Sequence, residues 1–183
     1  CETCGGGACV DLAADERQAT RAAESAAGRY PVETVEMMAA VCVEAENAEE
    51  IAFDRRFNHR TYGRIDQSIA MGALFTAYHL GCKAILALTE SGSTALFMSR
   101  NKIHVPIFAL TSQVGSQRRM MLYRNVVPVL MPQFSDRDEA LAHAEALMIE
   151  HGVLKPGDTY AITCGEPMGY PGGTNMLKVC RVA

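Results

Sequence analysis

Short apolar runs alternate with longer amphipathic segments along most of this chain, from about residue 64 onward. Near-continuous apolar runs are typical of strands buried on both faces, and amphipathic segments between them are typical of covering helices. We predict strands at 84–88, 106–110, 126–131, 159–163 and 176–182. We predict helices at about 66–80, 94–100, 114–123 and 135–152, and an earlier helix that begins near residue 31.

Residues that favour capping predict where these helices begin and end. Asp66 is expected to cap the helix at 66–80, Gly81 to end it, and Ser135 to cap the helix that ends at Gly152. The buried side of the helix at 66–80 should carry Ile69, Ala73 and Ala77. In the earlier helix Pro31 suits the first turn, and an apolar face is formed by Val35, Met38, Ala39, Cys42 and Ala45.

The last connection differs from the others. About a dozen residues rich in Gly and Pro separate Thr163 from Met176, too few for a crossover helix, so the fifth strand should return antiparallel. The predicted fold is therefore α/β: a three-layer αβα sandwich with a mixed five-stranded sheet of order 3-2-1-4-5. We divide the chain into a leader or remnant of a preceding segment at 1–23, a linker and helix region at 24–63, and an α/β domain at 64–183.

Composition narrows the classes of function. The formal net charge is −4, which argues against nucleic-acid binding because few phosphates could be neutralised. No apolar stretch approaches the ~20 residues of a membrane span, and the first residues lack the pattern of a signal peptide. Four of the seven cysteines, Cys42, Cys82, Cys164 and Cys180, lie in apolar segments, which suits a reducing, cytoplasmic location.

The three remaining cysteines lie close together at the start of the chain. Cys1 and Cys4, with Cys9, could form half of a zinc site, but no second cysteine or histidine pair follows at a suitable spacing. We favour a structural or accidental explanation and expect no metal site in this chain.

Residues 89–94, which we call the hydroxyl loop, lie between the first predicted strand and a helix. The loop offers four hydroxyl groups, a permissive glycine and backbone N–H groups at the start of a helix, as a phosphate group requires. A simpler alternative is that Ser93 or Thr94 only caps the helix. Because one hydroxyl suffices for capping, we favour anion binding.

Residues 165–175, which we call the closing loop, are dominated by Gly and Pro. They could simply form a long hairpin. Ligands of open α/β sheets, however, bind at the carboxyl ends of strands where the strand order reverses. With the first strand central, the hydroxyl loop and the closing loop should border one crevice at that point.

The sequence contains no Walker-type phosphate loop, no Gly-x-Gly-x-x-Gly dinucleotide motif, no His-Glu-x-x-His motif and no Gly-x-Ser-x-Gly elbow. Its five histidines are scattered without the spacing of metal ligands or of a catalytic triad. We therefore expect no catalytic residues in this chain.

Several segments resemble pyruvate kinases. Residues 24–35 resemble the stretch where the catalytic barrel of that family passes into its C-terminal domain, and residues 89–95 are similar to the family's effector-phosphate loop. Further matches occur in order at Ser99-Arg100, Pro106-Ile107, Leu122 to Arg124 with Val127-Pro128, and Gly172 to Asn175. The resemblance covers roughly residues 22–183 and is strongest to bacterial enzymes activated by sugar monophosphates or AMP.

The resemblance implies the regulatory domain of a cytoplasmic, homotetrameric glycolytic enzyme, which transfers phosphate from phosphoenolpyruvate to ADP with Mg²⁺ and K⁺. It implies that the effector phosphate is bound by Thr89, Ser91, Gly92, Ser93 and Thr94, and that Gly172, Gly173 and Thr174 close over it. Glu90 lies within the hydroxyl loop, and its charge should disfavour a second phosphate nearby.

The residues that catalyse the transfer in that family belong to a barrel and a lid. We therefore expect this chain alone to be inactive in phosphoryl transfer and to need no cofactor. A free-standing enzyme with its site at the crevice, a free-standing phosphometabolite-binding module and an oligomerisation module are the alternatives.

Overall fold

The computed structural model describes residues 30–47, 61–101 and 103–183. The chain divides into two compact units, Cys1–Glu50 and Ile51–Ala183. In the first unit the described part is one helix, α2 (Pro31–Asn47), which confirms the predicted helix; its Val35 and Cys42 side chains are exposed. The predicted boundary between residues 23 and 24 lies outside the described residues, as do residues 24–29 and 48–60 of the predicted region 24–63.

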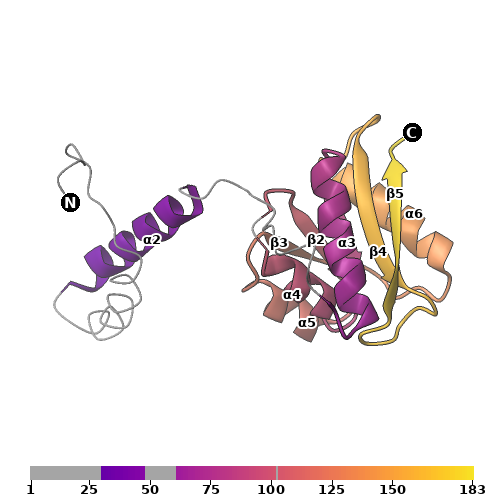
Figure 1. The fold of residues 1–183 in the computed structure, drawn as a ribbon, viewed down its shortest axis with the longest axis horizontal. Coiled ribbons are helices and arrows are strands. Elements are labelled where there is room, and N and C mark those ends of the chain that lie inside the picture. Colours follow the sequence, from indigo (N-terminus) through magenta and orange to yellow (C-terminus); the bar gives the residue numbers. More distant parts are fainter. Residues whose placement is uncertain (1–29, 48–60, 102) are drawn as a thin grey trace. The chain divides into compact units, whose positions relative to one another are not determined.

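The second unit is an α/β domain in which strands alternate with helices (Figure 1). In chain order its elements are α3 (Ile65–His79), β1 (Ile85–Leu88), α4 (Ser93–Ser99), β2 (Ile107–Thr111), α5 (Val114–Met120), β3 (Val126–Leu130), α6 (Arg137–Glu150), β4 (Thr159–Gly165) and β5 (Thr174–Arg181). All five predicted strands and all the predicted helices of this unit are present.

The strands form one sheet of order β3-β2-β1-β4-β5. β1 pairs in parallel with both β2 and β4, so that Ala87 lies opposite Ala109 on one side and Thr163 on the other. β5 is antiparallel to β4. The predicted strand order and the predicted reversal of the last strand are therefore confirmed.

Two apolar clusters cover the two faces of the sheet. On one face, side chains of β1, β2 and β4 such as Ile85 pack against α3, α4 and α5. On the other face, side chains such as Leu86 and Ile162 pack against α6. Every residue of β1 is buried, because this central strand has a neighbour on each side and helices on both faces. The domain is thus the predicted three-layer αβα sandwich.

Two predicted caps are wrong. α3 begins at Ile65, and Asp66 lies inside its first turn, where the side chain is buried and ion-paired rather than capping. The cap of α6 is Asp136, whose Oδ1 accepts a 2.9 Å hydrogen bond from the N–H of Glu139, and not Ser135. Ile69, expected on the buried side of α3, is only partly buried, whereas Ala73 and Ala77 are fully buried.

Candidate functional site

A cleft opens at the edge of the sheet where the carboxyl ends of β1 to β4 meet. Its walls come from the segments that follow these strands, including Thr89, Ser112, Phe134 and Tyr170. One part of the lining is apolar, from Leu88, Leu110, Met131, Pro132, Phe134 and Met168. The polar part is formed mainly by Thr89, Glu90, Thr111, Ser112, Gln133 and Thr174. No Lys, Arg or His is among the described residues that line this cleft.

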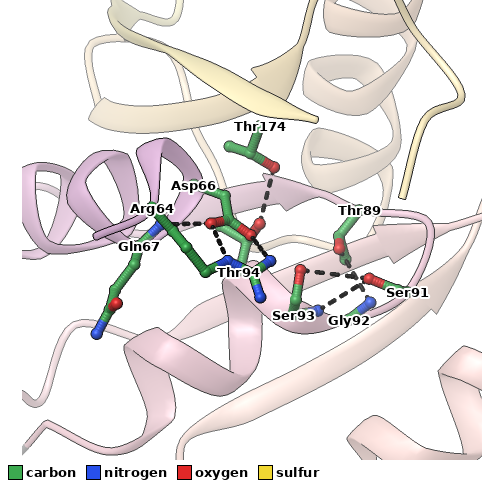
Figure 2. Close-up of polar contacts among 9 residues, drawn as sticks. All are labelled: Arg64, Asp66, Gln67, Thr89, Ser91, Gly92, Ser93, Thr94 and Thr174. Atoms are coloured by element: carbon green, nitrogen blue, oxygen red, sulfur yellow. Dashed lines mark hydrogen bonds and ion pairs between the residues drawn. The ribbon is translucent and has the colours of Figure 1, made fainter. Parts of the chain in front are cut away.

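The hydroxyl loop is folded back on itself by short-range hydrogen bonds (Figure 2). The Gly92 N–H donates to Thr89 Oγ1 at 3.0 Å, and the Ser93 N–H donates to Ser91 Oγ at 3.4 Å. The hydroxyls of Ser91 and Ser93 are 3.3 Å apart. These contacts gather three hydroxyl groups within one turn of chain, as an anion with several acceptor oxygens requires.

Gly92 allows this turn. Its φ of 80° lies in the left-handed region, and a Cβ at this position would lie 2.9 Å from Met120 Cγ. Gly92 is also the N-cap of α4, so neither Ser93 nor Thr94 occupies the cap position. The alternative in which Ser93 or Thr94 serves as the cap is therefore wrong.

Glu90 fastens the hydroxyl loop to its neighbours. Its backbone carbonyl accepts a 2.7 Å hydrogen bond from Ser116 Oγ in α5. Its carboxylate Oε2 accepts a 3.3 Å hydrogen bond from Ser112, directly after β2. The negative charge of Glu90 is thereby held at the wall of the cleft.

The closing loop is tied at its base and to the hydroxyl loop. Asn175 makes two contacts with the backbone of Glu166: its Oδ1 accepts from the Glu166 N–H at 3.0 Å, and its Nδ2 donates to the carbonyl at 2.7 Å. The Gly173 N–H donates to the Tyr170 carbonyl at 3.0 Å. The hydroxyls of Thr174 and Thr94 are 2.8 Å apart, and both side chains are buried. The two loops therefore meet at the point where the strand order reverses, as their positions in the sequence predict.

The nine predicted site residues occupy different parts of this arrangement. Thr89, Glu90, Gly172 and Thr174 line the cleft. Ser91, Gly92 and Ser93 form the turn of the hydroxyl loop, and Thr94 joins that loop to Thr174. Gly173 lies in the closing loop against Tyr170.

Sequence reasoning missed an ion pair beside these loops. Arg64 Nε and Nη2 donate to Asp66 Oδ1 and Oδ2 at 3.0 and 2.6 Å, and the bound carboxylate raises the pKa of the Arg64 guanidinium. Asp66 also accepts a 2.9 Å hydrogen bond from the Gln67 N–H. The signal in the sequence is an acidic residue at the start of a helix and on its apolar side, a position that also suits a helix cap.

Comparison with known proteins decides the family. Residues 67–180 match the family described as "Pyruvate kinase, alpha/beta domain". The chain belongs to the pyruvate kinase family. It is 37% identical over 161 residues to a protein named "Pyruvate kinase" of Buchnera aphidicola subsp. Baizongia pistaciae, covering 87% of this chain and 34% of the relative.

Two further pyruvate kinases show a similar match. "Pyruvate kinase II" of Salmonella typhimurium is 38% identical over 161 residues, covering 87% of this chain and 34% of that protein. "Pyruvate kinase" of Staphylococcus haemolyticus is 36% identical over 159 residues, covering 85% of this chain and 27% of that protein. The chain therefore spans about a third or less of the length of these pyruvate kinases, and the part it matches is the α/β domain.

The potential metal ligands of this pyruvate kinase domain can be compared only where the structure describes them. Within the described ranges, no group of three or more His, Cys, Asp and Glu residues is placed to hold a metal ion. Cys1, Cys4 and Cys9 lie outside those ranges. Cys82 and Cys164 are buried, and burial raises the pKa of both thiols, that of Cys164 to about 11 with a further contribution from Glu166. None of the described helices is long and apolar enough to cross a bilayer.

Proposed function

We propose that this chain is the effector-binding domain of a pyruvate kinase, and that it binds a phosphorylated metabolite between the hydroxyl loop and the closing loop. The observation that carries the proposal is the 2.8 Å contact between Thr94 and Thr174, because it brings a cluster of hydroxyls and a Gly-rich loop together beside an open cleft. In this proposal Thr89, Ser91, Gly92, Ser93 and Thr94 bind the phosphate, and Gly172, Gly173 and Thr174 close over it.

The charge of the cleft favours a ligand with one phosphate group. Glu90 is held at the cleft wall by Ser112, and no cationic side chain is among the described lining residues. A second phosphate would therefore meet a like charge without a compensating cation. The apolar part of the lining suits an uncharged ring. A sugar monophosphate or AMP fits both conditions.

The proposal extends to the whole enzyme, because the relatives are named pyruvate kinase. We propose that the protein to which this domain belongs works in the cytoplasm as a homotetramer, converting phosphoenolpyruvate and ADP into pyruvate and ATP. Mg²⁺ and K⁺ would be the ions required for that reaction, and they would bind in a part of the enzyme outside this domain. This chain alone should transfer no phosphate, and a coupled assay for pyruvate formation tests that statement.

Subunit contacts form the second part of the proposal. Several large apolar side chains of the α/β domain are exposed, among them Ile65, Phe75 and Leu80 from the α3 segment and Leu122, which is 88% exposed. Large apolar side chains exposed on a single subunit are candidates for burial between subunits. An oligomerisation module without ligand binding is the alternative that the same observation supports. Sedimentation with and without ligand separates the two.

A titration of the 183-residue chain with glucose 6-phosphate, AMP and fructose 1,6-bisphosphate tests the proposed site. A ligand that binds only the folded state raises the melting temperature with its concentration. We expect a shift with at least one monophosphate, and its loss in the double variant Ser91→Ala/Ser93→Ala. Ser135→Ala, a change at an exposed serine distant in sequence from both loops, is the matched control. No shift with any of the three, or an undiminished shift in the double variant, contradicts the proposal.

A further inference from the structure

Arg64 and Asp66 form a two-point ion pair at the start of α3. Both contacts are short, 3.0 and 2.6 Å, and they join two nitrogens of the guanidinium to two oxygens of the carboxylate. The side chain of Asp66 is 2% exposed and that of Arg64 is 58% exposed. A buried carboxylate needs its partners, and a two-point contact fixes the orientation of both side chains. The guanidinium is therefore held in one place although half of it faces solvent.

The pair is in contact with the closing loop. A Cβ at Gly172 would lie 3.3 Å from Arg64 Nη2 and 3.7 Å from Asp66 Oδ2, so the backbone at Gly172 lies close beside both partners. The φ of Gly172 is 72°, which other residues rarely adopt. The backbone conformation at this position thus favours glycine, and a side chain there would press on the guanidinium. Arg64 Cζ also lies 5.5 Å from the centre of the Phe97 ring, so the same guanidinium packs against α4.

Only one residue separates Gly172 from Thr174, which is bound to Thr94 at 2.8 Å (Figure 2). The segment 172–174 therefore lies beside the ion pair at one end and is hydrogen-bonded to the hydroxyl loop at the other. A segment this short cannot absorb a displacement at one end without moving the other. The position of the guanidinium consequently influences where Thr174 lies relative to the hydroxyl loop.

We propose that the Arg64–Asp66 pair is a positioning device for the effector site: it holds residues 172–174 of the closing loop at the distance from the hydroxyl loop that ligand binding requires. This inference rests on the proposed function. Neither Arg64 nor Asp66 is among the described residues that line the cleft, so in this proposal both act through Gly172 and Thr174. If the pair only supported the start of α3, its loss would change stability and leave the affinity of the folded protein unchanged.

The test compares glucose 6-phosphate binding by calorimetry for the 183-residue chain and for Asp66→Asn, Arg64→Gln, Gly172→Ala and Arg64→Gln/Gly172→Ala, well below each melting temperature. We expect each single variant to bind roughly tenfold more weakly, as when the competent loop position falls to about a tenth of the population. The double variant should bind little more weakly than either parent, because both changes disturb one contact. Asp158→Asn, which removes a carboxylate bonded to the Lys155 N–H in the turn before β4, should bind like the unmodified chain.

Hydrogen exchange gives a second readout that needs no variant. Glucose 6-phosphate should protect the amides of residues 172–174 and also the Gln67 N–H, which is bonded to Asp66. A lowered melting temperature with an unchanged dissociation constant, or protection of 172–174 without Gln67, overturns the inference and leaves the proposed function standing.

If the unmodified chain binds no monophosphate, the proposed function fails instead. The inference is then decided by exchange of residues 172–174 without ligand, which should be faster in Asp66→Asn and Arg64→Gln than in the unmodified chain. Equal rates overturn it.

Discussion

Thr94 and Thr174 are eighty residues apart in the chain, and their hydroxyl oxygens are 2.8 Å apart in the fold. Thr94 is the second residue of α4, and Thr174 is the first residue of β5. Both side chains are buried, so each hydroxyl group is hydrogen-bonded to the other instead of to water. This contact is the direct link between the hydroxyl loop and the closing loop.

Removing one hydroxyl of this pair should lower the free energy of unfolding more than removing both. Thr94→Val or Thr174→Val leaves the other hydroxyl buried without this partner, which should lower the free energy of unfolding by ~1–3 kcal/mol. Thr94→Val/Thr174→Val removes both groups and should be close to neutral. Urea unfolding followed by circular dichroism measures the coupling. Strictly additive losses would show that the hydroxyls do not depend on each other.

Thr163 should respond in the opposite way. Its side chain is completely buried, and its Oγ1 has no hydrogen-bond partner among the described residues. Thr163→Val keeps the shape and removes the unpaired group, so stability should stay equal or rise by up to ~1 kcal/mol. The same unfolding experiment checks this, with Thr94→Val as the contrasting variant. A clear loss of stability in Thr163→Val would contradict the prediction.

Two glycines form a matched pair for a backbone test. Gly92→Ala places a side chain at a φ of 80° and against Met120, which should cost at least ~1–2 kcal/mol of folding stability. Gly115 lies in α5 without a positive φ, and a Cβ there would meet nothing within 4 Å. Gly115→Ala should therefore raise stability by up to ~1 kcal/mol. Equal effects of the two changes would count against the special role of Gly92.

Glu90 should control the preference between one and two phosphates. Replacing its carboxylate with an amide in Glu90→Gln removes the like charge at the cleft wall. We expect the affinity for fructose 1,6-bisphosphate to rise relative to glucose 6-phosphate by about fivefold, or ~1 kcal/mol, the size of a partly solvated charge interaction. Glu139→Gln, at an exposed position in the first turn of α6, is the control. An unchanged ratio of the two dissociation constants would refute the prediction.

The thiol of Cys164 should make stability depend on pH in the alkaline range. Burial raises its pKa from 9.0 to about 11. Between these values the unfolded chain releases the proton while the folded chain keeps it, so the contribution of Cys164 is present below pH 9 and is lost as the pH rises through about 11. Stability should therefore fall more steeply from pH 8 to 10.5 in the unmodified chain than in Cys164→Ala. Parallel pH profiles would contradict this.

The sheet was predictable from sequence because its determinants are local and redundant. The fully apolar run of β1 indicates a central strand, and the short Gly- and Pro-rich connection before β5 leaves no room for a crossover helix. Strand order follows once the central strand and the reversal are known. The meeting of the two loops then follows from the order, without any knowledge of side-chain contacts.

The ion pair was not predictable by the same reasoning. Asp66 has the residue type and position of a helix cap, and the capping rule describes contacts within one segment. Its hydrogen-bond partners are Arg64 and Gln67, and Gly172, more than a hundred residues away, lies beside the carboxylate. Only the packing of α3 against the closing loop reveals this. For the same reason the sequence could place the hydroxyls of the site and not the group that holds the closing loop.

The two hydrogen bonds between Asn175 and the backbone of Glu166 affect more than the stability of one turn. The amide side chain contacts the backbone N–H and carbonyl of Glu166 as a neighbouring strand would, so the ladder of β4 and β5 is in effect completed by a side chain. The two ends of the loop between these residues are therefore held next to each other. Lengthening a loop whose ends are fixed costs little free energy, about 0.6 kcal/mol for each doubling. Residues 167–171 are thus a suitable place for replacing loop sequence. A segment of different length or chemistry grafted there would give the domain a new ligand while the sheet stays intact.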